Sequence, residues 1–368
     1  FEYGGVHVTF RSMHTAPYRS CGTAAVHSAD NRICENRDFI FPVFTPASSR
    51  RTEAVTLLLH GLNERHWMKY LPWGYTLCGR TGSTVMIIPI AFHMNRSPAQ
   101  WAQIRSMMPL ALLRKREEPG NRAVSFANAA LSQRLEEFPD RFISGGMQTI
   151  FDIEYLLRQI RSDADPLVLP DARVNLFGYS IGCSLAESLM MADSLRSKGA
   201  RLLQDPRAVL FCGGSLLEYA NPVSKAIIDE RANGALQEYF YHFGRDDAGS
   251  VLFNGLEQSS AGSQIPWKMI LASLMRAEFA PLFRIRKLRE QRRRIRVYHL
   301  PNDTVFSPEA VERTYGEAGM ESVITGLPEL PGSSHEVPFP LCEENRGAGS
   351  IQPVYHDFFS DVGSFFSS

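Results

Sequence analysis

Gly178-Tyr179-Ser180-Ile181-Gly182 is the stretch that decides the fold of this chain of 368 residues. It follows a strand-forming run at residues 173–177 and precedes a helix-forming run at residues 183–196. We therefore expect a strand, a sharp turn and a helix, with Ser180 on the turn and glycines where any side chain would collide. Because G-x-S-x-G also arises by chance, the interpretation depends on the sequence around it.

A second buried strand is expected upstream, at Val55-Thr56-Leu57-Leu58-Leu59. It runs directly into His60-Gly61-Leu62-Asn63-Glu64, where a glycine allows the backbone to turn and present an N–H group. Such a loop, placed beside a serine on a turn, suits the stabilisation of an oxyanion.

Two further strand ends carry an acid and a base. A strand at residues 295–300 is followed by Asp303, and a short strand near residues 323–327 leads to His335 in a loop of small residues. The chain order is therefore serine, aspartate, histidine. His356 in the expected last helix, at residues 352–366, is the alternative base.

This order of residues, each just after a strand, resembles the α/β-hydrolase superfamily from about Thr56 to the C-terminus. The segments at residues 60–64 and 92–96 are similar to those of a bacterial subfamily without a firm substrate. The resemblance implies a three-layer α/β fold. Its sheet would be mostly parallel, with about eight strands, helices on both faces and a cap insertion.

The expected domain organisation is one core with two insertions. Residues 1–215 and 291–368 are assigned to the core, residues 216–290 to a cap, and residues 92–145 to a smaller insertion over the sheet edge. Strands at residues 7–11 and 39–44 are expected to form the antiparallel edge. A helix is expected at residues 147–161, and the basic segment at residues 284–296 is interpreted as a solvated helix face.

The chemistry assigned to these residues is nucleophilic. A serine hydroxyl becomes a good nucleophile when a histidine, held by a carboxylate, removes its proton, so Ser180, His335 and Asp303 are the expected catalytic residues. The backbone N–H groups of Ile181 and Leu62 are the expected oxyanion donors, with Asn63 as the alternative second donor.

Four residues are expected to bind substrate: His93, Arg96, Tyr179 and Trp267. Arg96 follows a core strand at the ligand-bearing edge of the sheet and suits a substrate carboxylate. A structural salt bridge or a loop hydrogen bond is an equal alternative for His93 and Arg96.

Composition excludes several classes of function. With 39 basic and 39 acidic side chains, the chain has no net field that would attract nucleic acid, and no apolar stretch predicts stable membrane insertion. The six cysteines and the scattered histidines have no metal-ligand spacing, so no metal and no cofactor are expected. Mostly free thiols favour the cytoplasm, although Phe1 leaves a removed leader open and Cys21 and Cys34 form a candidate pair.

The expected function is hydrolysis of a small carboxylic ester through an acyl-enzyme intermediate. A serine peptidase, a thioesterase and an acyltransferase use the same triad, and a non-catalytic α/β-hydrolase-like binding protein is the alternative of another class. The sequence leaves the oligomeric state open.

Overall fold

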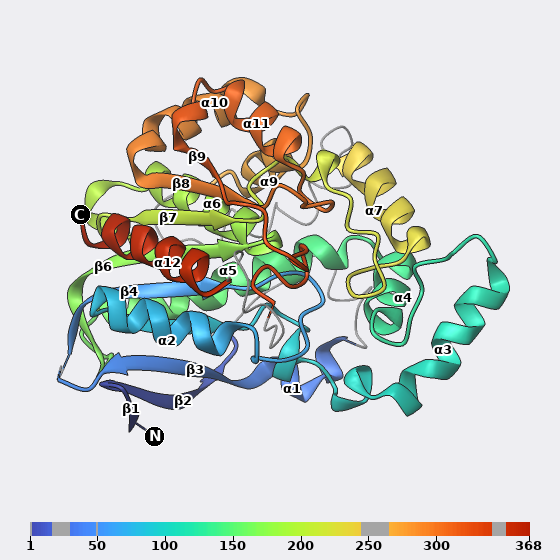
Figure 1. Ribbon diagram of the computed structural model, residues 1–368, viewed down its shortest axis with the longest axis horizontal. Coiled ribbons are helices and arrows are strands. Elements are labelled where there is room, and N and C mark those ends of the chain that lie inside the picture. Colours follow the sequence, from blue (N-terminus) through green and yellow to red (C-terminus); the bar gives the residue numbers. More distant parts are fainter. Residues whose placement is uncertain (1, 17–29, 49–50, 244–264, 341–350) are drawn as a thin grey trace.

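The computed structural model describes residues 2–16, 30–48, 51–243, 265–340 and 351–368 (Figure 1). The described residues form one nine-stranded sheet in the order β1-β2-β3-β5-β4-β6-β7-β8-β9. The strands are β1 (Glu2–Tyr3), β2 (Val6–His14), β3 (Asp38–Pro46), β4 (Thr52–Leu59), β5 (Thr84–Ile88), β6 (Val168–Tyr179), β7 (Arg207–Phe211), β8 (Ile295–His299) and β9 (Ile324–Gly326).

The sheet combines antiparallel strand pairs at one edge with parallel strand pairs in the rest. β1, β2 and β3 pair antiparallel along one edge, and β3 also pairs antiparallel with β5. From β5 through β9 all neighbours are parallel, as expected for strands joined by helical crossovers. The expected antiparallel edge and the parallel centre are both confirmed.

Helices cover both faces of this sheet. One face carries α5 (Arg141–Arg161), α6 (Ile181–Leu195), α9 (Trp267–Met275), α10 (Pro281–Gln291) and α11 (Pro308–Gly316), whose apolar side chains share a core with the inward residues of β4 and β5. The opposite face carries α2 (Tyr70–Thr81) and α12 (Ile351–Ser367), which lie side by side in Figure 1. This three-layer arrangement, with its strand order and its turn at Ser180, is the α/β-hydrolase fold.

The remaining helices lie at the edge of the sheet where β4 and β6 end. α1 (Cys34–Arg37), α3 (Ile104–Glu117) and α4 (Ala129–Glu137) precede α5, and α7 (Glu230–Phe243) lies beside α4 (Figure 1). Part of the expected cap, residues 244–264, lies outside the described residues. α10 belongs to the same segment but leads directly into β8.

Two local expectations are corrected. α5 begins at Arg141, before the expected start at Met147. The basic segment is not uniformly solvated, because Arg284 is fully buried, pairs with Glu317 at 2.9 Å and donates to the Ser273 carbonyl at 3.1 Å. The thiols of Cys34, Cys78, Cys183 and Cys212 are free, and Cys21 lies outside the described residues.

Candidate active site

Ser180 sits on a sharp turn between β6 and α6, with φ 55° and ψ −125°. A non-glycine residue rarely adopts this conformation, so the surrounding structure must hold it in place. The flanking glycines make the turn possible. A Cβ atom on Gly178 would lie 2.7 Å from the Cys183 Cα atom, and one on Gly182 would collide with the Leu59 carbonyl. The turn therefore requires glycine at both positions.

The structure brings Ser180, His335 and Asp303 into one hydrogen-bonded chain. His335 Nε2 lies 2.8 Å from Ser180 Oγ, and His335 Nδ1 lies 2.9 Å from Asp303 Oδ2. Because Nδ1 faces a carboxylate, it carries the proton and leaves Nε2 as the acceptor for the serine hydroxyl. All three side chains are buried.

Asp303 is itself held by the backbone. Its Oδ1 accepts hydrogen bonds from the N–H groups of Val305 at 2.8 Å and Phe306 at 2.9 Å. These bonds fix the carboxylate against His335. The alternative base, His356, is exposed on α12.

Tyr179 supports the histidine. Its hydroxyl donates to the His335 backbone carbonyl, and its ring stacks on the imidazole with 5.6 Å between ring centroids. Burial raises the pKa of this hydroxyl well above its usual value, so it remains a donor. Tyr179 therefore positions His335, although part of it also lines the opening above Ser180.

His60 locks the loop that follows β4. Its Nε2 accepts from the Ile90 N–H at 2.8 Å, so Nδ1 carries the proton and donates to the Gly61 carbonyl at 2.8 Å. Burial, with His93 nearby, lowers the pKa of His60 well below its usual value and keeps the ring neutral. This histidine is thus structural, and it joins the ends of β4 and β5.

Gly61 allows the same loop to approach Ser180. A Cβ atom there would lie 3.3 Å from Ser180 Cβ, which is tighter than ordinary packing. The Gly61 N–H donates to the Tyr70 hydroxyl at 3.1 Å, and that hydroxyl donates to Glu64 at 2.6 Å. Lys69 pairs with the same carboxylate. Tyr70 and Lys69 escaped the sequence analysis, because nothing in the sequence shows that α2 returns to this loop.

The expected oxyanion donors flank Ser180. Ile181 begins α6 directly after Ser180, and Leu62 lies on the loop beside it. Within the described residues, neither backbone N–H has an acceptor, so both are free to bind a developing negative charge. Asn63 has φ 58°, and its side chain donates to the carbonyls of Ala127 at 2.9 Å and Ala226 at 2.6 Å.

Arg96 is buried and already paired in this structure, unlike the sequence-based expectation of a residue that meets a substrate carboxylate. It is fully buried, pairs with Asp152 at 2.8 Å and donates to Asn36 and the Pro89 carbonyl. Its guanidinium also lies 4.0 Å from the centroid of the Phe39 ring. The structural salt bridge weighed as its alternative is therefore what the structure contains.

Trp267 and His93 differ in their access to the site. Trp267 is buried on α9 against Phe151, and it lines none of the three pockets at and beside Ser180. Its expected substrate contact is therefore corrected, because its indole is used in packing. His93 is also buried but lines an internal cavity.

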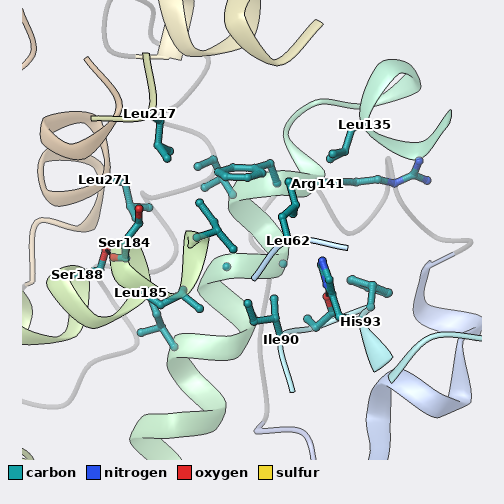
Figure 2. A pocket seen from close by; sticks show the side chains of 18 of the residues that line it. Leu62, Ile90, His93, Leu135, Arg141, Ser184, Leu185, Ser188, Leu217 and Leu271 are labelled. Atoms are coloured by element: carbon teal, nitrogen blue, oxygen red, sulfur yellow. Dashed lines mark hydrogen bonds between the residues drawn. The ribbon is translucent and has the colours of Figure 1, made fainter. Parts of the chain in front are cut away.

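Three openings meet near Ser180. The polar mouth is lined by charged and polar side chains from the loop after β4 and by Ser180, His335 and Glu336. The connecting pocket contains Ser180, Ile181 and Phe306. The inner cavity shares Leu62, Phe142, Ile181 and Leu217 with that pocket and continues to His93 (Figure 2).

Within the described residues, no group of three His, Cys, Asp or Glu side chains is arranged to hold a metal ion. None of the described helices is long and apolar enough to span a lipid bilayer.

A family model described as "Family of unknown function (DUF6051)" matches residues 8–367. The chain belongs to this family. The DUF6051 match includes most of β2, every strand from β3 onward and all three residues of the hydrogen-bonded chain at Ser180. No curated protein matches the sequence.

Solved structures similar to this DUF6051 chain have low sequence identity. The carboxyl esterase 2 of the mycorrhizal fungus Tuber melanosporum is 12% identical, with 99% of this chain and 86% of the other covered and a TM-score of 0.46. The esterase Est22 is 12% identical over 99% and 82% of the two chains, with a TM-score of 0.49. The peroxisomal α/β-hydrolase Lpx1 of Saccharomyces cerevisiae is 14% identical over 99% and 90%, with a TM-score of 0.45.

Proposed function

We propose that this protein is a serine hydrolase that cleaves carboxylic esters of small molecules through an acyl-enzyme intermediate. The observation that carries the proposal is the continuous hydrogen-bonded chain from Ser180 Oγ through His335 to Asp303. In this arrangement His335 carries its proton on Nδ1, which is the tautomer in which the imidazole acts as a base toward serine.

In the acylation step, Ser180 Oγ forms a bond to the ester carbonyl carbon while its proton passes to His335 Nε2. The carbonyl oxygen becomes negative, and the N–H groups of Leu62 and Ile181 are the donors assigned to it. α6 begins at Ile181, so the positive end of its dipole acts on the same charge. His335 then gives its proton to the leaving alcohol oxygen, and the carbon–oxygen bond breaks.

In the deacylation step, His335 removes a proton from a water molecule that attacks the acyl-enzyme. The acid is released and Ser180 regains its proton. Both steps require the His335 imidazolium to stay aligned with Ser180. Asp303, fixed by two backbone N–H groups, supports that alignment.

We also assign the part of residues 216–290 that precedes α9 to a cap over this site, with residues 92–145 as a second covering segment, because α9 and α10 belong to the helix layer on the sheet. Leu217 and Phe240 from the first segment and Phe142 from the second line the pocket at Ser180, which supports the assignment. Limited proteolysis with and without a bound inhibitor tests it. The cap assignment requires cleavage within the cap to slow when the site is occupied.

The proposed function is tested with a fluorophosphonate probe and intact mass spectrometry. The wild-type protein is expected to gain one probe adduct, and Ser180→Ala is expected to gain none because the nucleophile is gone. Ser97→Ala is the control, since Ser97 is a serine of the 92–145 segment that lies outside the triad. A folded wild type that stays unlabelled by the fluorophosphonate would argue for the non-catalytic alternative.

A substrate panel then separates the enzymes that use the same triad. Matched p-nitrophenyl ester, thioester and aminoacyl p-nitroanilide substrates are expected to give the highest kcat/KM for the ester. A preference for the anilide or the thioester would replace the esterase proposal with a peptidase or a thioesterase.

A further inference from the structure

The position of His335 gives the substrate a direction in the site. His335 lines the polar mouth with Ser180 and does not line the connecting pocket or the inner cavity. Because this histidine must pass its proton to the leaving oxygen, the alcohol part lies on the mouth side. The acyl part then points the other way, past Leu62 and Ile181.

The inner cavity on that side is narrow and almost entirely apolar. Its volume is about 80 Å³, against about 260 Å³ for the polar mouth. Figure 2 shows Leu62, Leu135, Leu217 and Leu271 around it, and Ile90 closes another side. A slim apolar chain is the ligand that such a cavity favours.

His93 is one of the few polar side chains in this largely apolar lining, which also includes Ser184 and Ser188. Its Nδ1 donates to the Ala91 carbonyl at 2.9 Å, so Nε2 is the acceptor of the neutral ring. Desolvation lowers the pKa of His93 to about 4, which keeps the ring neutral at physiological pH. His93 is 93% buried (7% exposed), and Nε2 has no hydrogen-bond partner among the described residues. A buried acceptor left in this state carries a desolvation cost, which a ligand donor would remove.

Two arginines at the same cavity do not serve as anion receptors. Arg134 and Arg141 both direct their guanidinium groups to Asp30, at distances from 2.8 to 3.3 Å. In Figure 2 the Arg141 guanidinium points away from the cavity, so only its hydrocarbon stem lines it. A negatively charged chain end would therefore find no unpaired cation from these two residues.

We infer that the acyl group of the substrate is a slim apolar chain that fills the inner cavity and carries a neutral hydrogen-bond donor, such as a hydroxyl, for His93 Nε2. This inference rests on the proposed function. It assigns His93 as a specificity-determining residue and the polar mouth as the exit for the alcohol.

The location of the substrate's acyl chain is tested by filling the inner cavity with a larger side chain. Gly146 on α5 lines it, and a Cβ atom there would meet only Leu185 Cδ2, at 3.9 Å. Gly146→Leu is expected to lower kcat/KM for p-nitrophenyl octanoate by about tenfold or more and to change that for p-nitrophenyl acetate by less than about twofold. Gly234→Leu is the matched control, because Gly234 is exposed on α7 with no atom near its Cβ position. Equal losses for acetate and octanoate in Gly146→Leu would overturn the assignment.

The role of His93 is tested with p-nitrophenyl esters of hydroxyoctanoic acids that carry the hydroxyl at successive carbons. Wild type is expected to prefer one positional isomer over octanoate by roughly tenfold. His93→Asn keeps a donor for the Ala91 carbonyl but removes the deep acceptor, so it should abolish the preference. His93→Gln retains an acceptor at that depth and should restore part of it. Equal rates for octanoate and every isomer in wild type would overturn the role of His93.

These outcomes are separable from failure of the proposed function. If wild type neither hydrolyses the acetate ester nor reacts with the fluorophosphonate, the hydrolase proposal fails. Calorimetric titration of Ser180→Ala with octanoic and hydroxyoctanoic acids still measures the cavity without turnover. Tighter binding of one hydroxy acid, lost in Ser180→Ala/His93→Asn, supports the cavity assignment, and equal binding of all the acids contradicts it.

Discussion

Single residues around Ser180 act mainly by holding one protonation state or one orientation. Tyr179, His60 and His93 are all fully or nearly fully buried, and each keeps a neutral ring whose hydrogen bonds are directed to backbone groups. Ser180 therefore lies in a rigid, preorganised surrounding, which under the proposed function lowers the cost of reorganisation during catalysis.

Removal of the Tyr179 hydroxyl is expected to slow the chemical step. In Tyr179→Phe the His335 backbone carbonyl loses its donor, so the imidazole is less well aligned. We expect kcat to fall by about tenfold with KM nearly unchanged. Tyr355→Phe, which removes a hydroxyl that bonds to Thr76 and not to His335, is the control and should keep wild-type kcat. A change in KM alone would contradict a positioning role.

Glu187 is expected to make the stability of the protein depend on pH. Burial raises its pKa from the usual 4.5 to about 8, and Tyr315 donates to it at 2.8 Å. Between these two pH values the folded chain keeps a proton that the unfolded chain has released. The free energy of unfolding must therefore fall as pH rises from about 4.5 towards about 8.

Glu187→Gln removes this proton from the equilibrium. We expect the variant to be more stable than wild type at neutral pH by on the order of 2 kcal/mol, with a flatter pH dependence. Urea unfolding followed at several pH values measures both quantities. Parallel pH profiles for variant and wild type would show that Glu187 is ionised in the folded state.

At the scale of helices and strands, the sequence predicts what depends on local pattern. The apolar runs of β4 and β5 identify buried parallel strands, and the glycines of the Ser180 turn predict its sharp geometry. The start of α5 was placed too late because Gly145 and Gly146 interrupt the helical signal. The partner of Arg96 was not predictable, since Asp152 is distant in sequence and meets it only after folding.

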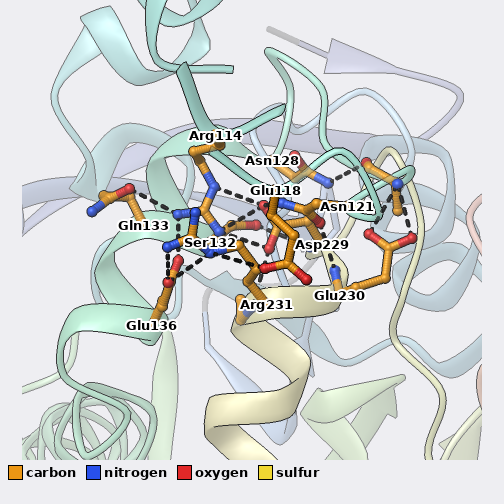
Figure 3. A network of polar contacts seen from close by, with 12 residues as sticks. Arg114, Glu118, Asn121, Asn128, Ser132, Gln133, Glu136, Asp229, Glu230 and Arg231 are labelled. Carbon is orange, nitrogen blue, oxygen red and sulfur yellow. Dashed lines mark hydrogen bonds and ion pairs between the residues drawn. The ribbon is translucent and has the colours of Figure 1, made fainter. Parts of the chain in front are cut away.

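A network of polar contacts joins α3 and α4 to α7 (Figure 3). Like the pair of Arg96 and Asp152, it connects residues that are distant in the sequence. Arg114 and Asp229 are both fully buried, and two hydrogen bonds of 2.7 and 2.8 Å connect them. Asp229 also caps α7 by accepting from the Ala232 N–H at 3.1 Å. The 92–145 and 216–290 segments are thereby joined by a fully buried pair.

Breaking this pair from one side should be costly. Asp229→Leu leaves a buried guanidinium with one acid, Glu136, and is expected to destabilise the fold by about 3–5 kcal/mol. Arg114→Met should cost a similar amount, and the double variant should cost less than the sum. Denaturant unfolding of the four proteins gives the coupling. Additive effects would show that the two side chains stabilise the fold independently.

At the scale of the whole molecule, the two faces of the sheet are covered unequally. Five helices cover one face, while α2 and α12 cover the other within the described residues. The aromatic side chains of α12 do much of this packing. Phe359 is fully buried and stacks on Phe177 of β6 with 6.1 Å between ring centroids.

Phe359→Ala is therefore expected to destabilise the protein by about 3–5 kcal/mol, because it leaves a cavity beneath α12. Phe10→Ala on β2 removes the same atoms from a side chain that is 55% exposed, and should change stability by less than about 1 kcal/mol. Thermal unfolding of both variants measures the difference. Equal losses would mean that α12 contributes little to the fold.

Asn63 connects the loop after β4 to both proposed covering segments. Its backbone belongs to the loop of the oxyanion donors, and its amide bonds to one carbonyl in each covering segment. Under the proposed function, a shift of either segment would displace this loop, so the proposed oxyanion donors would be aligned only while both segments stay in place. We expect the protein to be inactive while the two covering segments are open. Each turnover would then require these segments to close around the bound substrate.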